Sequence, residues 1–147
     1  MKKIILAMVA VMVPLMLSAG STDFWFRHFS VEDGLSSSAV RAIMQDKYGF
    51  MWLGTDDGLN RYDGTTIKIY RLNPEGVNDY ISFLYDTTDR IWIGTGDGVY
   101  IYNYETENFE PFKLLTAKGD SIKTNVNHIA EDRDGNLWFS TVGQGIF

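Results

Sequence analysis

The chain has 147 residues with a formal net charge of −6, no cysteine, 45% hydrophobic residues and 14% aromatic residues. This composition supplies enough apolar surface for a packed core and excludes a disordered chain. The acidic balance argues against nucleic-acid binding by this segment, because an acidic surface repels phosphate groups. The lack of cysteine excludes disulfides, thiolate catalysis, cysteine-ligated zinc and lipoprotein acylation.

The first twenty residues have the pattern of a secretory signal peptide. Two lysines follow the initial methionine, residues 4–17 are apolar apart from Pro14, and Ser18 and Ala19 provide the small residues of a cleavage site. We predict a signal-peptide helix over residues 1–20 and export to the periplasm. An uncleaved membrane anchor is the alternative, but the apolar run is shorter than the ~20 residues that span a bilayer.

Residues 21–38 are predicted to contain the outer strand of a ring-closing blade and the connection after it. Phe26 and Phe29 align with Ile67 and Tyr70 of a later outer strand. Propellers commonly close their ring by combining strands from both ends of the chain. The other strands of this blade would then come from the far C-terminal part of a longer parent chain.

The remaining sequence repeats one pattern three times. In each copy an aspartate lies six residues before a tryptophan, and a Gly-Thr or Ser-Thr pair begins two residues after it. The interval between copies is the ~40–45 residues typical of four-stranded propeller blades. Tyr, Phe, Trp, Ile, Thr and Gly are also plentiful, which favours strands joined by tight turns. We predict an all-β chain of about three four-stranded β-propeller blades in an incomplete ring. The blades are residues 39–72, residues 73–114 and the truncated residues 115–147.

Turn residues divide each repeat into strands. Asp46 and Asp132 open Asp-x-x-Gly turns after the first strand, and Asp86 is aligned with them, although Asp89 replaces the glycine in its copy. The second strands are nearly continuous apolar runs, as expected where both faces of a blade are covered. Outer strands are predicted at residues 66–72 and 108–114. The residues predicted to form the repeat core, rather than to bind ligand, are Trp52, Trp92, Trp138, Gly54 and Gly94.

The motifs "MWLGTDDGLNRYDG" and "IWIGTGDGVYIY", with the opening "HFSVEDGLSSSAV", resemble the two-component regulator propeller repeat. The resemblance covers residues 24–147. It implies the N-terminal periplasmic sensor region of a bacterial hybrid two-component histidine kinase whose parent chain is anchored in the inner membrane. It further implies an oligosaccharide ligand, additional blades and a kinase in the parent chain, and a homodimeric parent. The segment itself would be no enzyme and would need no cofactor or metal.

Catalytic and metal-binding interpretations have little support in the sequence. His28 and His128 occupy different repeat positions, without a matching serine or metal-ligand spacing. The stretch "DRDGN" from Asp132 resembles the start of a calcium loop but lacks the later ligands. A propeller glycosidase would need a placed pair of carboxylates, whereas Asp46 and Asp86 recur at a turn position that suits structural capping. That enzyme class and a purely protein-interaction propeller remain the alternatives.

Ligand binding is expected where the turns between second and third strands and the connections between blades reach the central channel. Loops on a rigid scaffold are the usual place of recognition, and carboxylates, amides, hydroxyls and an arginine suit sugar hydroxyls. The candidate ligand-binding residues are Asp56, Asp57, Arg61, Asp97, Gln144, Ser37, Ser38, Asn78 and Asn125.

Overall fold

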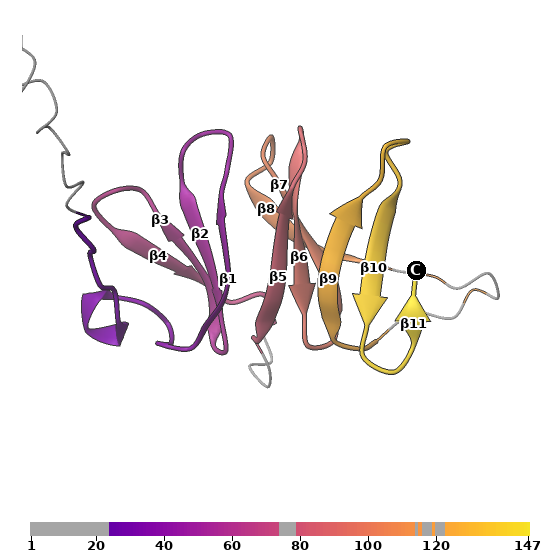
Figure 1. The fold of residues 1–147 in the computed structure, drawn as a ribbon, viewed down its shortest axis with the longest axis horizontal. Coiled ribbons are helices and arrows are strands. Elements are labelled where there is room, and N and C mark those ends of the chain that lie inside the picture. The colour runs from indigo at the N-terminus through magenta and orange to yellow at the C-terminus, as the bar shows by residue number, and fades with distance from the viewer. Residues whose placement is uncertain (1–23, 74–78, 114, 116–118, 120–122) are drawn as a thin grey trace, which may run out of the picture.

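The computed structural model describes residues 24–73, 79–113, 115, 119 and 123–147, and these form three antiparallel sheets that stand side by side (Figure 1). The predicted signal peptide and Asn78 lie outside the described residues. Within the described residues, no helix has the length and apolar character needed to cross a bilayer.

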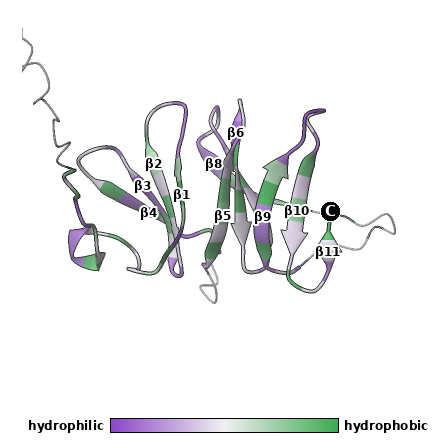
Figure 2. Ribbon diagram, viewed as in Figure 1, coloured by the Kyte–Doolittle hydropathy of each residue, from purple (hydrophilic) through white to green (hydrophobic). Residues whose placement is uncertain are grey.

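Each sheet is a meander in which consecutive strands pair. The first sheet contains β1 (Val40–Gln45), β2 (Met51–Thr55), β3 (Gly58–Tyr62) and β4 (Ile67–Tyr70). The second contains β5 (Ile81–Asp86), β6 (Arg90–Thr95), β7 (Gly98–Asn103) and β8 (Asn108–Phe112), and the third contains β9 (Val126–Glu131), β10 (Leu137–Thr141) and β11 (Gly145–Ile146). The predicted all-β fold of propeller blades in an unclosed ring is confirmed. Hydrophobic residues lie along the strands, and the loops that join β1 to β2 and β9 to β10 are hydrophilic (Figure 2).

The segment before β1 contains a short 3-10 helix, η2 (Val31–Asp33), and no strand among residues 24–30. Phe26 is 93% exposed. The segment contacts the first sheet through side chains, since Arg27 donates to the Tyr62 hydroxyl at 3.1 Å and the Phe29 ring lies 5.0 Å from that of Tyr62, but it pairs with none of the described strands. Its role in ring closure therefore stays a prediction.

The hairpin between β5 and β6 differs from its two counterparts. The last ladder pairs before the three loops are Gln45↔Met51, Asp86↔Ile91 and Glu131↔Leu137. The middle loop is therefore one residue shorter, and Asp86 lies within β5 instead of in the turn. The alignment of Asp86 with Asp46 and Asp132 is wrong, because Thr87 occupies the structural position of those two aspartates.

This shorter loop changes the hydrogen bonding of the repeated tryptophan. Asp46 accepts the indole N–H of Trp52 at 2.7 Å, and Asp132 accepts that of Trp138 at 2.9 Å. The indole nitrogen of Trp92 is buried, and none of the described residues accepts a hydrogen bond from it. Thr87 is too short to replace the aspartate and donates its hydroxyl to a backbone carbonyl of its own loop. An unsatisfied buried donor costs about 1–3 kcal/mol, so the middle hairpin is less stable than its neighbours.

The tryptophan of each second strand faces the following sheet. Trp52 is 0% exposed and its ring lies 5.1 Å from that of Tyr102 in the second sheet. Trp92 is 8% exposed and lies 5.7 Å from Phe139 in the third sheet. Trp138 is 52% exposed, contrary to the predicted burial, because no sheet of the described residues covers its face.

The repeated glycines lie where neighbouring sheets approach most closely. A Cβ atom on Gly54 would meet Ile81 Cγ2 at 2.6 Å, and one on Gly94 would meet the backbone oxygen of Val126 at 2.9 Å. The first contact joins β2 to β5, and the second joins β6 to β9, so each reaches the first strand of the next sheet. The third copy has Ser140 at this ladder position, opposite His128, on a face that no described sheet covers.

Candidate functional site

The strand order gives the molecule two distinct ends. The lower end in Figure 1 carries the turns 55–58, 95–98 and 141–145, which join second to third strands. The upper end carries the loops between first and second strands. Adjacent strands run antiparallel, so the connections that enter each first strand also lie at the lower end. Apart from Arg61, the described ligand candidates lie at the lower end.

Two of the lower-end carboxylates are paired with arginines. Asp56 accepts hydrogen bonds from Arg41 Nε at 2.7 Å and from Arg41 Nη2 at 3.1 Å. The hydrogen bond from Arg41 lowers the pKa of Asp56. Asp57 pairs in the same bidentate manner with Arg71. Both pairs are exposed to solvent, so they order the surface more than they stabilise the fold.

A repeated threonine closes each turn at this end. The hydroxyls of Thr55, Thr95 and Thr141 lie 2.9, 3.0 and 2.9 Å from the backbone oxygens of Gly58, Gly98 and Gly145. Asp97 also lies within hydrogen-bonding distance of the Thr95 hydroxyl, at 2.8 Å. Asp97 and Gln144 are therefore exposed side chains on turns that the threonines hold in place.

The connections between sheets bring polar groups beside these turns. The hydroxyl of Ser37 accepts the Ala39 N–H at 3.1 Å, and Ser38 is exposed. Asn125 holds the third turn through its backbone oxygen, which accepts the Val142 N–H at 2.9 Å. The side-chain oxygen of Asn125 is buried and has no hydrogen-bond partner among the described residues. Because it is buried, it is out of reach of a ligand at the lower end.

The sequence did not single out the buried Asn60, which organises the first connection. Its side-chain oxygen accepts the Ser36 N–H at 2.9 Å, and its amide donates to the Ser36 hydroxyl at 2.8 Å. Asn60 lies in β3 and is 0% exposed. Its role could not be read from the sequence, because β3 also contains the polar Arg61 and the partner of Asn60 is 24 residues away.

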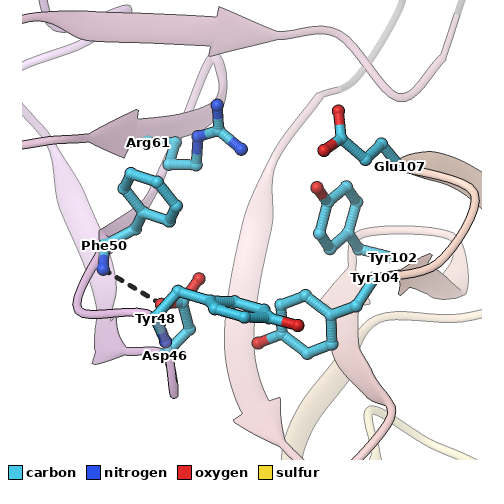
Figure 3. Close-up of a pocket in the computed structure, with 7 residues that line it drawn as sticks. All are labelled: Asp46, Tyr48, Phe50, Arg61, Tyr102, Tyr104 and Glu107. Atoms are coloured by element: carbon cyan, nitrogen blue, oxygen red, sulfur yellow. Dashed lines mark hydrogen bonds between the residues drawn. The ribbon is translucent and has the colours of Figure 1, made fainter.

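Arg61 was wrongly placed with the lower-end candidates. It lies in β3 opposite Trp52, and the strand carries it away from the turn toward the upper end. There it lines a cavity of about 390 Å³ between the first two sheets (Figure 3). The other lining residues are Asp46, Tyr48, Phe50, Tyr102, Tyr104 and Glu107. They occupy unrelated positions in two repeats, so no repeat motif could reveal the cavity.

Hydrogen bonds and burial tune the groups around this cavity. The Asp46 carboxylate accepts the backbone N–H groups of Tyr48 and Phe50 at 2.9 and 3.0 Å, in addition to the Trp52 indole. Tyr104 donates its hydroxyl to Asp86 at 2.8 Å. Burial, and then the hydrogen bond to Asp86, raise the pKa of Tyr104, and burial raises the pKa of Asp86.

One position beside the cavity has a strained backbone. Glu107 has φ 53°, in the left-handed region, and is the only non-glycine residue with positive φ among those described. We expect Glu107→Gly to raise the free energy of unfolding by up to ~1 kcal/mol, because glycine adopts this conformation without steric cost. Glu105→Gly, in the same loop at a residue without positive φ, should lower it. Urea unfolding would compare the two, and a loss of stability for Glu107→Gly would contradict the assignment of strain.

Two aspartates that cap turns, Asp132 and Asp63, predict that the stability of the folded chain falls in acid. Hydrogen bonds from the Trp138 indole and then from Asn136 lower the pKa of Asp132 to about 2, and hydrogen bonds from Thr66 and Thr65 lower that of Asp63. Unfolded aspartate titrates near ~3.9, so both carboxylates stabilise the folded chain above about pH 4. This contribution should be lost as the pH falls toward 2.

Urea midpoints measured between pH 5 and 2 would test this loss of stability in acid. The fall of the midpoint with pH should be smaller for Asp132→Asn than for the parent chain. Asp86 acts in the opposite direction, because its raised pKa makes its charge unfavourable at neutral pH. A stability that rises on acidification would mean that Asp86 outweighs the caps.

Other sites of chemistry are not evident in the described residues. No group of three or more His, Cys, Asp or Glu side chains there is placed to hold a metal ion. The ring of His128 packs 4.2 Å from that of Phe83, and His28 is exposed before η2. The DRDGN loop uses Asp132 to cap its own turn, through the N–H groups of Asp134 and Asn136 at 2.9 Å.

Residues 34–57 and 121–143 match the family described as two component regulator propeller. These two segments of the chain are similar to two-component regulator propeller repeats. The repeat in the middle of the chain is the one with the shortened hairpin, and it lies outside the two matched segments.

The relatives and solved structures that the chain resembles are longer proteins, and the chain spans less than a fifth of each. The chain is 56% identical over 59 residues to "Histidine kinase P4" of Formosa agariphila, covering 40% of this chain and 4% of that protein. It superposes with a TM-score of 0.71 and 32% identity on the extracellular domain of the B. thetaiotaomicron hybrid two component system BT3049, covering 82% of this chain and 18% of that one. For the extracellular domain of BT4673 from the same organism, the TM-score is 0.63 and the identity 27%, with coverage of 74% and 16%.

Proposed function

We propose that the chain forms part of the extracellular, periplasmic sensor propeller of a hybrid two-component histidine kinase, and that its lower end binds an oligosaccharide. The observation that carries the proposal is the 32% identity, over 82% of the chain, to the extracellular domain of a hybrid two component system. The chain supplies blades of the sensor. The kinase, further blades and a homodimeric arrangement belong to the parent protein.

The lower end has the chemistry that sugar hydroxyls require. Asp57 and Asp97 are exposed carboxylates on turns fixed by threonine hydroxyls, and Arg41 and Arg71 add donors beside them. Groups held by a rigid scaffold lose little entropy on binding, which favours recognition of a flexible polar ligand.

The structure gives less support to a glycosidase. Asp46 and Asp132 accept hydrogen bonds from backbone N–H groups and a tryptophan indole within their own turns. Carboxylates held in this way act as turn caps, and they are not directed at a shared substrate position. Binding is the function that the geometry favours.

The proposal can be tested with the exported chain and a panel of neutral and acidic oligosaccharides. A recognised oligosaccharide at a hundred times its Kd should stabilise the chain by about 2.7 kcal/mol, measured as a shift in the thermal midpoint. The double variant Asp57→Asn/Asp97→Asn should lose that shift. Asp134→Asn, which alters an exposed carboxylate at the upper end, should keep it. Equal losses in both variants, or no shift with any oligosaccharide, would overturn the proposal.

A further inference from the structure

The cavity at the upper end is a feature that the proposed lower-end site does not use. Its walls come from the first two sheets: Tyr48, Phe50 and Arg61 from one, and Tyr102, Tyr104 and Glu107 from the other. Its volume of about 390 Å³ falls within the ~300–1,000 Å³ of small-molecule sites.

Aromatic rings line this cavity on several sides. The rings of Tyr48 and Tyr104 meet edge to face, with centroids 5.2 Å apart, and bridge the two sheets. Phe50 and Tyr102 stand on opposite walls above them (Figure 3). Lys47 supports the Tyr48–Tyr104 pair, since its ammonium lies 4.4 Å from the centre of the Tyr104 ring. The cavity therefore offers flat apolar surfaces to a ring-shaped ligand.

Arg61 presents an unused guanidinium on one wall. The guanidinium stacks 4.6 Å from the centre of the Phe50 ring and 5.7 Å from that of Trp52. Arg41, Arg71 and Arg90 each form an ion pair with an aspartate, but the side chain of Arg61 has neither an ion pair nor a hydrogen bond among the described residues. These ring contacts hold the guanidinium against the wall while leaving its N–H donors free. A planar, fixed fork is the geometry that pairs bidentately with a carboxylate.

The opposite wall supplies groups for hydroxyls. Glu107 projects beside Tyr102 (Figure 3), and the described residues give its carboxylate no hydrogen-bond partner. Its backbone is the strained one, with φ 53°. Strain retained at a non-glycine residue points to a role for its side chain. The buried Tyr102 likewise carries a hydroxyl without a hydrogen-bond partner among the described residues.

We propose that this cavity is a second binding site, which takes one acidic sugar ring of the uronic acid type. Its carboxylate pairs with Arg61, a ring face packs on the tyrosines, and ring hydroxyls bond to Glu107 and Tyr102. The choice of a sugar as the ring rests on the proposed oligosaccharide sensing, whereas the preference for a carboxylate rests on Arg61 alone. An apolar ligand fits less well, because it would leave Arg61 and Glu107 desolvated and unpaired.

The test uses the whole chain and two sugars that differ only at C6, glucuronate and glucose. Binding is followed by tyrosine and tryptophan fluorescence and by calorimetry. Glucuronate should bind at least tenfold more tightly than glucose. Arg61→Gln should weaken glucuronate binding about ten- to hundredfold, because a charged hydrogen-bonded pair is lost. Arg61→Lys, which keeps the charge without the fork, should recover only part of the affinity, and Glu107→Gln should weaken both sugars. Circular dichroism would check that each variant is folded.

Three results would overturn the inference: equal affinities for glucuronate and glucose, unchanged glucuronate binding in Arg61→Gln, or binding of benzoate in preference to either sugar. The lower-end variant Asp57→Asn/Asp97→Asn separates this site from the proposed function. Oligosaccharide binding that depends on those aspartates alone would sink the upper site and leave the proposed function standing. Glucuronate binding that depends on Arg61, without any oligosaccharide response at the lower end, would support the upper site and contradict the proposed function of the lower end.

Discussion

Replacing Trp52 by alanine is expected to lower the free energy of unfolding by about 3–5 kcal/mol. Trp52 is 0% exposed and packs against Tyr70 of its own sheet and against Tyr102 and Phe109 of the second sheet. The substitution leaves a large cavity between two sheets and leaves the Asp46 carboxylate without its indole donor. Domains are commonly stable by only ~5–15 kcal/mol, so the loss is a large share of the total.

Trp138→Ala is the matched control for this substitution. Trp138 occupies the same repeat position and donates to Asp132 at 2.9 Å, but it is 52% exposed and no described sheet packs on it. Its replacement should cost much less. Urea unfolding monitored by far-ultraviolet circular dichroism would compare the two variants. Equal losses would show that the hydrogen bond to the aspartate, and not packing between sheets, determines the role of this tryptophan.

Gly94→Ala should lower the free energy of unfolding by roughly 1–3 kcal/mol, the usual cost of overpacking. The backbone of Gly94 has no positive φ, so alanine is not excluded by conformation. The cost arises because the new methyl group would lie 2.9 Å from the backbone oxygen of Val126 and 3.2 Å from Ser82 Oγ. A backbone carbonyl in a sheet cannot rotate away, so β9 would have to move.

Ser140 provides the control for the glycine, because it takes the same ladder position in the third sheet. Ser140→Ala should change the free energy of unfolding by no more than ~0.5 kcal/mol. Denaturant midpoints of Gly94→Ala, Ser140→Ala and the parent chain would test this difference. A Gly94→Ala variant as stable as its parent would mean that the second and third sheets are free to separate in solution.

Most of the strand pattern could be predicted from local turn chemistry. The outer strands expected at 66–72 and 108–114 include the observed β4 and β8, because glycine and aspartate mark turns wherever the sequence places them. The misplacement of Asp86 has a different origin. The loop between β5 and β6 is one residue shorter than its counterparts, but the residue just before it is also an aspartate. The six-residue spacing to Trp92 is therefore kept, and only pairing with β6 reveals the shift.

The candidate sites were less predictable than the strands. The lower-end turns repeat, so Asp56 and Asp97 could be grouped from sequence alone. Arg61 could not be placed with the cavity, because strand direction determines which end a residue reaches and its cavity partners, such as Tyr104 and Glu107, come from a different repeat. The exposure of Trp138 depends on which sheets surround it, and no local motif specifies this.

The orientation of the tryptophans also gives the molecule a polarity. Each sheet offers its tryptophan face to the opposite face of the next sheet, so the contact joins two different surfaces. Such contacts are heterologous and repeat head to tail. Every sheet has both faces covered only when the sheets form a closed ring. Isolated copies of this chain, with Trp138 exposed on one face and Ile43 67% exposed on the first sheet, are expected to associate head to tail instead of as symmetric dimers.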